Sequence, residues 1–202
     1  QRSWNYLKAA NLPVMFCISK CNEEHSDYNK ALDTLIGKYG SIVCPVTIPT
    51  SDGTAVIDLV HNVAYKANGN KVTKIDVPAA DADHVEELRE KLTETAAGAS
   101  EELMEKFFDT MELSEEEIVE GLKLGVKDRL VVPVFASDAM TNVGTAAIMQ
   151  GLIDYCPAPA DSGKGTLGFV FKTISDKFGK YSLVKVLSGK LVGGASLYNV
   201  RS

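Results

Sequence analysis

The first fifty residues alternate between short runs of hydrophobic positions and a segment with helical spacing. The runs at 13–18 and 41–50 contain few polar residues, which is typical of strands in a parallel sheet covered on both faces. Between them, residues 26–39 carry apolar side chains three and four positions apart and end near Gly40, which predicts a helix. Pro45 interrupts the second run and favours an edge position or a bulge. This strand–helix–strand order predicts an α/β fold.

The pattern changes after residue 50. Residues 54–78 are rich in β-branched side chains and contain Asn68-Gly69, the strongest short-range signal for a hairpin. Further along the chain the apolar spacing becomes helical, and Ser100 marks the start of a second helix. Ser114 begins a third helix, because it forms a capping box with Glu117. The first of the three helices should bury one apolar face, made by Val85, Leu88 and Leu92.

The last third of the chain returns to a strand pattern. Residues 129–139, "RLVVPVFASDA", predict a buried strand that ends in a polar loop, and residues 145–156 predict a helix that stops before Pro157. Beyond residue 166, apolar and polar positions alternate between glycines, as at the opening of a β-barrel. Residues 158–165, "APADSGKG", nearly fit a phosphate-binding loop. We reject this site because Gly165 stands where Ser or Thr must hold magnesium, and because no strand precedes it.

Charge changes this picture, because it is unevenly distributed. The net charge is −6, yet residues 161–202 carry +5, so that residues 1–160 carry −11. The stretch from Asp76 to Glu120 holds sixteen acidic and three basic residues. Such a surface is repelled by nucleic-acid phosphates and suits a neutral or basic protein partner, although an ordinary solvated helical surface has the same pattern.

The cysteine content and the N-terminus add little chemistry. The four cysteines, at positions 17, 21, 44 and 156, form no tight zinc-ligand pair, and we interpret them as unlinked thiols in a reducing cytoplasm. We expect no metal site. No apolar run reaches the ~18 residues that a membrane span needs. The chain begins without an initiator Met or a signal-peptide core, so we expect a fragment or a processed chain.

Polar residues follow two of the predicted parallel strands. Ser19, Lys20 and Asn22 come directly after the first strand, and Ser137 and Asp138 come directly after Phe135. Ligands of open α/β sheets bind at the carboxyl ends of the strands, so the two loops are candidates to frame one pocket. Each loop alone is a weak signal, because many strands end in turns of Ser, Asn or Asp.

The order of these features resembles translational GTPases of the elongation factor G type, over the full length of the chain. In that family an Asn-Lys-x-Asp strand end is followed by an inserted subdomain called G′, a Ser-Ala loop, a "DYxPxP" segment and a β-barrel domain II. The segments that carry the resemblance are "ISKCN", "VIDLVHNVAYK", "EELMEKFFDTMELSEEEIVEGLKLGV", "VVPVFASDA", "IDYCPAP" and "GFVFKTISDKFGKYSLVKVLSGKL".

The resemblance implies the C-terminal part of a P-loop-type GTPase domain with an inserted α+β G′ subdomain, followed by the start of a β-barrel domain II. Residues 1–50 would form the second half of the G domain, including the base-binding strand and helix. Residues 51–128 would form G′, and residues 129–158 would end the G domain. A linker at 159–166 would lead into domain II at 167–202.

The resemblance also implies a cytoplasmic, ribosome-associated protein that couples GTP hydrolysis to translocation. The family's phosphate loop, switch segments and magnesium ligands have no counterpart here. We therefore expect no catalytic residue in this chain, no GTP or Mg²⁺ bound to it alone, and no GTPase activity from it alone. The implied partners are the ribosome and its large-subunit stalk protein, the latter through the acidic G′ helices; no membrane and no DNA are expected. The alternative is a ribosome-binding or ribosomal-protection paralogue with weakened or altered nucleotide specificity.

Transferred residue by residue, the family's guanine-binding motifs fall on Ser19, Lys20, Asn22, Ser137 and Asp138. The aliphatic stem of Lys20 would cover the base, and Ser19 would brace neighbouring loops. Asn22 replaces an Asp whose carboxylate accepts both guanine donors, and an amide would set its own donor against one of them. We expect this change to cost ~2–4 kcal/mol of guanine binding and to favour weak GTP binding or tolerance of xanthine nucleotides. Asp138 replaces an Ala whose backbone N–H meets the guanine oxygen.

Overall fold

The computed structural model describes residues 2–69, 71–158, 163 and 165–200, and the chain divides into two compact units. Unit 1 is Gln1–Pro157 and unit 2 is Ala158–Ser202. The buried hydrophobic cluster of the described residues lies entirely in unit 1. The fold that positions the candidate site is therefore that of unit 1.

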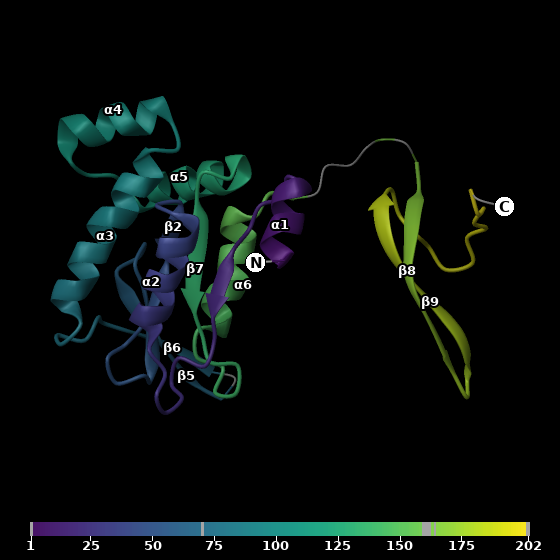
Figure 1. Ribbon diagram of the computed structural model, residues 1–202, viewed down its shortest axis with the longest axis horizontal. Coiled ribbons are helices and arrows are strands. Elements are labelled where there is room, and N and C mark those ends of the chain that lie inside the picture. Colours follow the sequence, from purple (N-terminus) through teal and green to yellow (C-terminus); the bar gives the residue numbers. More distant parts are fainter. Residues whose placement is uncertain (1, 70, 159–162, 164, 201–202) are drawn as a thin grey trace. The chain divides into compact units, whose positions relative to one another are not determined.

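Unit 1 is built around a three-stranded parallel sheet (Figure 1). Its central strand is β7 (Val132–Ala136), with β1 (Phe16–Ile18) on one side and β2 (Val43–Pro45) on the other. Every residue of β7 is buried, as expected for a strand with neighbours on both sides and helices on its faces. The register pairs Ile18 with Ala136, so that β1 and β7 end together. The predicted α/β class and parallel pairing are confirmed.

Two expectations for the strands were wrong. β1 is an edge strand of the described sheet and only half-buried, with Cys17 exposed, because a hydrophobic run does not reveal how many neighbours a strand has. The run at 41–50 is not one strand but two, β2 and β3 (Thr47–Pro49). Val46 lies between them and donates its N–H to Val134 while accepting from Leu59, so the chain passes there from one sheet to the other. Pro45 does end an edge strand, as predicted.

The second sheet of unit 1 is antiparallel, in the order β3-β4-β5-β6. Its remaining strands are β4 (Ala55–Asp58), β5 (Val63–Asn68) and β6 (Lys71–Ile75). β5 and β6 form the hairpin predicted at Asn68-Gly69, and Gly69 has the positive φ of +59° that such a turn favours.

Six helices occur in the described part of unit 1. They are α1 (Arg2–Ala9), α2 (Tyr28–Tyr39), α3 (Ala82–Ala97), α4 (Glu101–Thr110), α5 (Glu115–Asp128) and α6 (Thr145–Tyr155). Helix α2 packs on β1 and β2, and α5 packs on β7 and α6. The side chain of Phe135 lies directly against Gly151 of α6. None of the described helices combines the length and apolar character needed to cross a bilayer.

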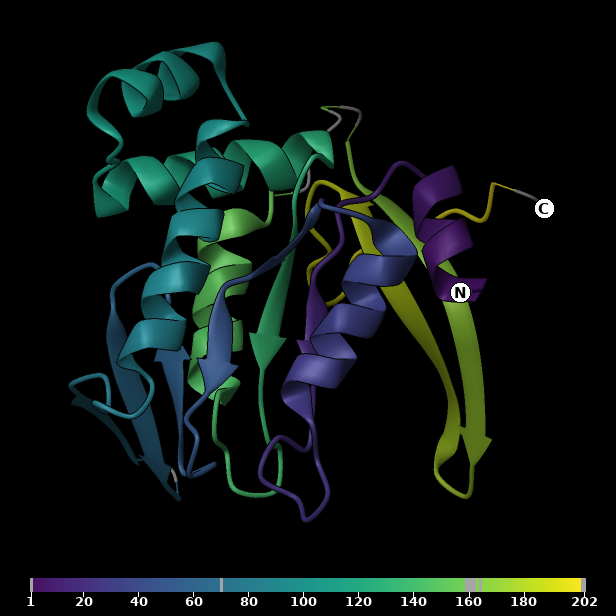
Figure 2. The same cartoon turned by 60° about the vertical axis from the view of Figure 1, so that its left-hand side comes forward.

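Helices α3, α4 and α5 pack together as one group (Figure 2). The predicted caps are confirmed: Ser100 accepts a hydrogen bond from the backbone of α4, and Ser114 forms a reciprocal capping box with Glu117. Helices α3 and α5 approach closely at Gly121, where an added Cβ would lie 2.4 Å from the carbonyl oxygen of Ala96. The absence of a side chain at this position therefore permits the packing.

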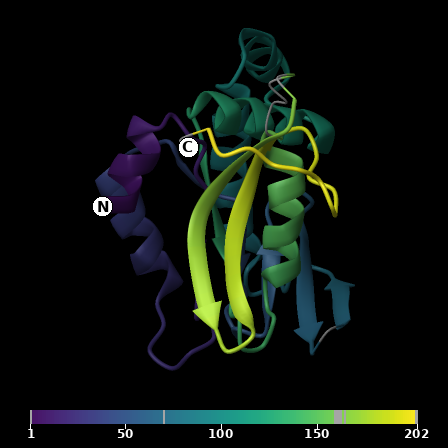
Figure 3. The ribbon, with the colours of Figure 1, turned by 90° about the vertical axis from the view of Figure 1, so that its right-hand side faces the viewer.

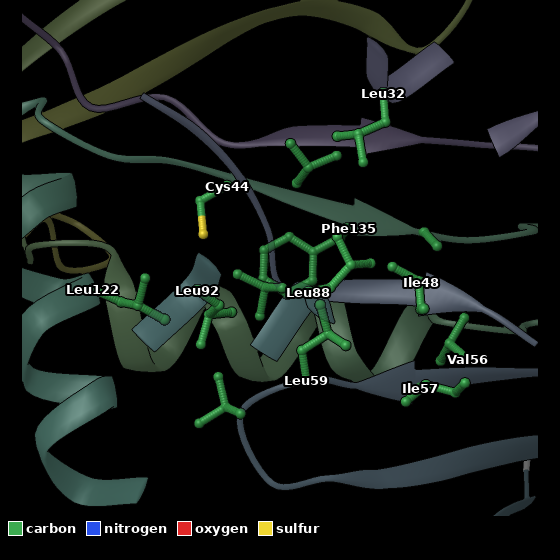
Figure 4. Close-up of a cluster of buried hydrophobic side chains, with 14 of the residues drawn as sticks. Leu32, Cys44, Ile48, Val56, Ile57, Leu59, Leu88, Leu92, Leu122 and Phe135 are labelled. Atoms are coloured by element: carbon green, nitrogen blue, oxygen red, sulfur yellow. The ribbon is translucent and has the colours of Figure 1, made fainter. Parts of the chain in front are cut away.

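The core of unit 1 joins both sheets to these helices (Figure 4). Phe135 of β7 and Cys44 of β2 meet apolar residues of the antiparallel strands and of α3 and α5, among them Leu59, Leu92 and Leu122. The parallel sheet, the antiparallel sheet and the helical group thus share one continuous core.

Unit 2 is described as a single antiparallel hairpin of β8 (Leu167–Asp176) and β9 (Gly179–Ser188), seen in Figure 3. The alternating pattern beyond residue 166 predicted these strands. No strand follows within the described residues 189–200, so a closed barrel is not formed by them. Most of the 158–165 segment, including the rejected phosphate-loop resemblance and the predicted linker, lies outside the described residues.

Candidate functional site

The predicted site residues lie where the parallel strands β1 and β7 end. The backbone N–H of Ser137 donates to Ile18 O at 2.9 Å, and the N–H of Cys21 donates to Ser137 O at 3.2 Å. These two bonds continue the strand pairing into the loops, which we call the 19–22 loop and the 137–142 loop. The two loops therefore meet at the carboxyl edge of the sheet, where α/β proteins bind ligands.

Lys20 occupies a special position in the 19–22 loop. Its φ is +66°, a left-handed conformation that is uncommon outside glycine. Its side chain is 73% exposed, and its one ion pair with a described residue is long, 3.9 Å from Nζ to Glu23 Oε1. The lysine is therefore free to lay its aliphatic stem along a ligand. Ser19, beside it, is exposed as well.

The side chain of Asn22 connects the 19–22 loop to the 137–142 loop. Its Nδ2 donates to Thr141 Oγ1 at 2.9 Å, whereas its Oδ1 is buried and has no hydrogen-bond partner in the described structure. The sequence expectation had the amide nitrogen facing the base. The structure instead gives the nitrogen a partner and leaves the oxygen as the open acceptor. Thr141 is not among the residues that the sequence predicts for the site.

Ser137 and Asp138 are both buried, each 4% exposed. Ser137 Oγ lies 3.1 Å from Cys17 Sγ. The Asp138 carboxylate accepts from Met140 N at 2.8 Å, and the Asp138 N–H donates to Val143 O at 2.8 Å. The backbone N–H expected to meet a guanine oxygen is therefore already engaged, and a ligand oxygen would have to share or replace this bond.

The tight return of the 137–142 loop depends on Gly144. This residue has φ +76°, and a Cβ there would lie 2.1 Å from Ala136 O. Only glycine fits this approach without displacing the end of β7. Gly144 lies in the segment "TNVGT", where an Asn and a Gly close to each other are typical of a turn, but this segment is not part of the site that the sequence predicts.

The five predicted residues do not all line one cavity. Ser19 and Lys20 line a pocket of about 310 Å³ beside the start of α2. Asn22 lines a neighbouring pocket of about 580 Å³, whose opposite wall is the β3–β4 turn around Gly53. The two loops are thus joined through their backbones, whereas Ser19, Lys20 and Asn22 line adjacent pockets, and Ser137 and Asp138 are buried.

Cys21, between Lys20 and Asn22, is structural. Burial raises the pKa of its thiol, and the neutral Sγ–H donates to Ile18 O at 3.1 Å. A thiol held neutral is a poor nucleophile and a poor metal ligand. Among the described residues, no group of three or more His, Cys, Asp or Glu side chains is arranged to hold a metal ion.

A second concave surface, which we call the acidic groove, lies among α3, α4 and α5. It has a volume of about 830 Å³. Its apolar lining comes from Val85, Phe107, Met111 and Ile118, and its acidic residues are Glu86, Glu90 and Glu112. Arg89 also lines it, but this guanidinium already donates to the carbonyl oxygens of Leu59 and Val60. The positive charge of Arg89 offsets only part of the negative charge, so the groove combines an apolar lining with a net negative charge.

Comparison with known proteins supports the fold. The sequence matches no known protein-family profile. The structure is similar to the crystal structure of a protein from Thermus thermophilus, with a TM-score of 0.84 and 23% sequence identity. The match covers 96% of this chain and 30% of that protein, so this chain spans less than a third of its structural neighbour's length. The two proteins share this mixed parallel and antiparallel α/β fold.

Proposed function

We propose that this chain is a segment of an elongation factor G-like translational GTPase and that its 19–22 and 137–142 loops form an altered purine-binding site. The observation that carries the proposal is the hydrogen-bonded meeting of these loops at the ends of β1 and β7. Segments about 120 residues apart in sequence are brought together at the sheet edge where a nucleotide base would bind.

The chemistry of Asn22 supports altered base specificity. Its Oδ1 is buried without a hydrogen-bond partner and, after a small movement of the side chain, can accept from a purine N1–H, whereas a carboxylate would offer a second acceptor oxygen for the guanine amino group. Its Nδ2 retains a second hydrogen beyond the one given to Thr141, and that hydrogen suits a carbonyl oxygen on the base. Xanthine has a carbonyl where guanine has an amino group. We therefore propose that the site binds xanthine nucleotides at least as well as guanine nucleotides.

Hydrolysis of the nucleotide is proposed for a longer protein and not for this chain. We assign no catalytic residue here, and the described residues do not fit a Mg²⁺ site, since no cluster of three acidic or His side chains is found among them. The contribution of this chain would be to hold and select the base.

The binding proposal can be tested on the isotope-labelled chain by NMR. Titration with millimolar XMP or GMP should give saturable amide shifts at Lys20, Asn22 and Asp138, with XMP at least as effective as GMP. AMP serves as the control, since it presents no N1–H. Shifts confined to other surfaces, or absent altogether, would count against a base site.

The second candidate is a ribosome-binding protein without a working nucleotide site. The observation that favours it is the Asp138 N–H, which is already bonded to Val143. In this case the chain would show no purine-dependent shifts, but the intact protein would still co-sediment with ribosomes in the absence of nucleotide.

The acidic groove supports the proposed stalk-protein partner. An apolar lining with acidic residues suits an apolar segment flanked by basic side chains and disfavours competing RNA. Titration of the chain with the large-subunit stalk protein should shift amides in α3, α4 and α5, and Glu90→Lys should weaken that binding. Unchanged spectra in these helices would argue against the partner.

A further inference from the structure

A pocket of about 580 Å³ beside the base loops has a composition that the proposed nucleotide site does not explain. We call it the carboxylate pocket. One wall is the segment from Cys21 to Asn29, the floor is the end of β3, and the other walls are the 50–53 turn and the start of α3. All of these elements belong to unit 1.

The pocket is strongly acidic. Four carboxylates line it, and the described lining contains neither Lys nor Arg, leaving His84 as its one side chain able to carry positive charge. The four carboxylates are Glu23, Asp27, Asp52 and Asp81. Four negative charges around one concavity attract a cationic ligand.

Three of these carboxylates already have local roles. Asp27 caps α2 by accepting from Lys30 N at 2.9 Å, and Glu23 faces Lys20 at 3.9 Å. Asp52 accepts from Thr50 Oγ1 at 2.6 Å and from Thr54, and these hydrogen bonds lower its pKa. These residues set the charge of the pocket but leave little unmet bonding capacity.

Asp81 is different. It is 8% exposed, and its Oδ1 accepts from Ser51 N at 3.0 Å, while its buried Oδ2 has no hydrogen-bond partner in the described structure. It stands at the N-cap of α3, where an Asp normally accepts from the helix, yet its side chain makes no capping bond. The carboxylate thus reaches across to the 50–53 turn and keeps one oxygen without a donor.

A buried carboxylate oxygen without a donor is unfavourable and calls for a partner. No ion pair to Asp81 is found within the described part of the chain. A metal ion is a poor candidate, because these residues form no group of three suitable ligands. An ordered water would supply only the missing donor, whereas an organic cation would bring both the missing donor and the missing charge.

We propose that the carboxylate pocket binds a guanidinium group, with Asp81 as its principal acceptor. A guanidinium has five donors in one plane and pairs well with carboxylates. It can serve more than one acceptor at once, and Asn22, whose Oδ1 also lacks a donor, lines the same pocket. The group can belong to an arginine side chain of a protein partner or to a free guanidinium compound.

The test compares two molecules of nearly the same shape on the 202-residue chain. N-acetyl-arginine amide carries a guanidinium, and N-acetyl-citrulline amide replaces it with a neutral urea. At constant ionic strength, the arginine compound should give saturable NMR shifts at Ser51 and Asp81, and the citrulline compound should not. Agmatine and an acetyl-Gly-Arg-Gly-amide peptide are titrated alongside. Tighter binding of agmatine indicates a free ligand, and tighter binding of the peptide indicates an arginine side chain.

Asp81→Asn keeps the acceptor for Ser51 and removes the charge, so it should weaken arginine binding about tenfold or more. Asp33→Asn, at an exposed position of α2 that lines neither the carboxylate pocket nor the acidic groove, should leave binding unchanged. Equal binding of arginine and citrulline, non-saturating shifts, or equal affinity of the Asp81→Asn variant would overturn the proposal. If that variant fails to fold, the arginine–citrulline comparison on the unchanged chain decides. None of these results depends on nucleotide binding.

Discussion

At the residue scale, the burial of the Cys44 thiol predicts how the unfolding free energy depends on pH. Burial raises the pKa of Cys44 from its ordinary value of 9.0 to about 12. The unfolded chain therefore releases this proton near pH 9, while the folded chain keeps it to about pH 12. Its contribution to stability is complete below pH 9 and is lost as the pH rises from 9 towards 12, by at most about 1.4 kcal/mol per pH unit.

Urea unfolding at several pH values measures this effect. The difference in unfolding free energy between the wild type and Cys44→Ala should shrink as the pH rises above 9. Cys17→Ala is the matched control for the loss of a thiol, because Cys17 is exposed. Parallel pH curves for the wild type and Cys44→Ala would contradict the assignment.

The sequence located the candidate residues but not the state of their side chains. Ser19, Lys20 and Asn22 could be placed at a strand end because a hydrophobic run stops there. That Asn22 donates to Thr141, and that Asp138 already uses its N–H, depends on contacts between segments far apart in the chain. No local pattern encodes which end of an amide will lack a partner.

At the element scale, we predict that replacing two helical glycines by alanine has opposite effects on the unfolding free energy. Gly121→Ala places a Cβ 2.4 Å from Ala96 O in the neighbouring helix, which cannot retract as a side chain would. We expect this change to lower the unfolding free energy by about 1–3 kcal/mol. Gly37 lies within α2, and a Cβ there meets nothing within 4 Å.

Gly37→Ala should therefore stabilise the protein by about 0.5–1 kcal/mol, because alanine loses less entropy in a helix. Thermal and urea unfolding of the two variants measures both effects. Tolerance of Gly121→Ala would show that α3 and α5 do not pack as closely as described, and destabilisation by Gly37→Ala would contradict the open space described at that position.

The elements were predictable where the signal is local. The capping box of Ser114 and the Asn68-Gly69 turn act within a few residues, and both occur as predicted. The exchange of sheets at Val46 was not predictable, because it is set by hydrogen bonds to Val134 and Leu59, more than ten residues away in sequence. The half-burial of β1 was not predictable either, because it depends on the position of β1 at the edge of the sheet, beside the distant strand β7.

At the scale of the whole molecule, the parallel sheet and the antiparallel sheet of unit 1 share one core. The central strand β7 is contributed by residues 132–136, and its neighbours come from residues before 50, so the antiparallel sheet and the helical group form an excursion between them. The sequence predicted this interruption from its change of period. The excursion returns the chain to place the 137–142 loop beside the 19–22 loop.

In the proposed purine site at these loops, the amide of Asn22 takes the place of a carboxylate. The most direct measurement is the affinity of the intact protein for GTP and XTP, in the wild type and in Asn22→Asp. The account predicts that Asn22→Asp tightens GTP binding about a hundredfold and weakens XTP binding, because a carboxylate accepts both guanine donors. Unchanged affinities for both nucleotides, or a wild type that binds GTP tightly and rejects XTP, would contradict it.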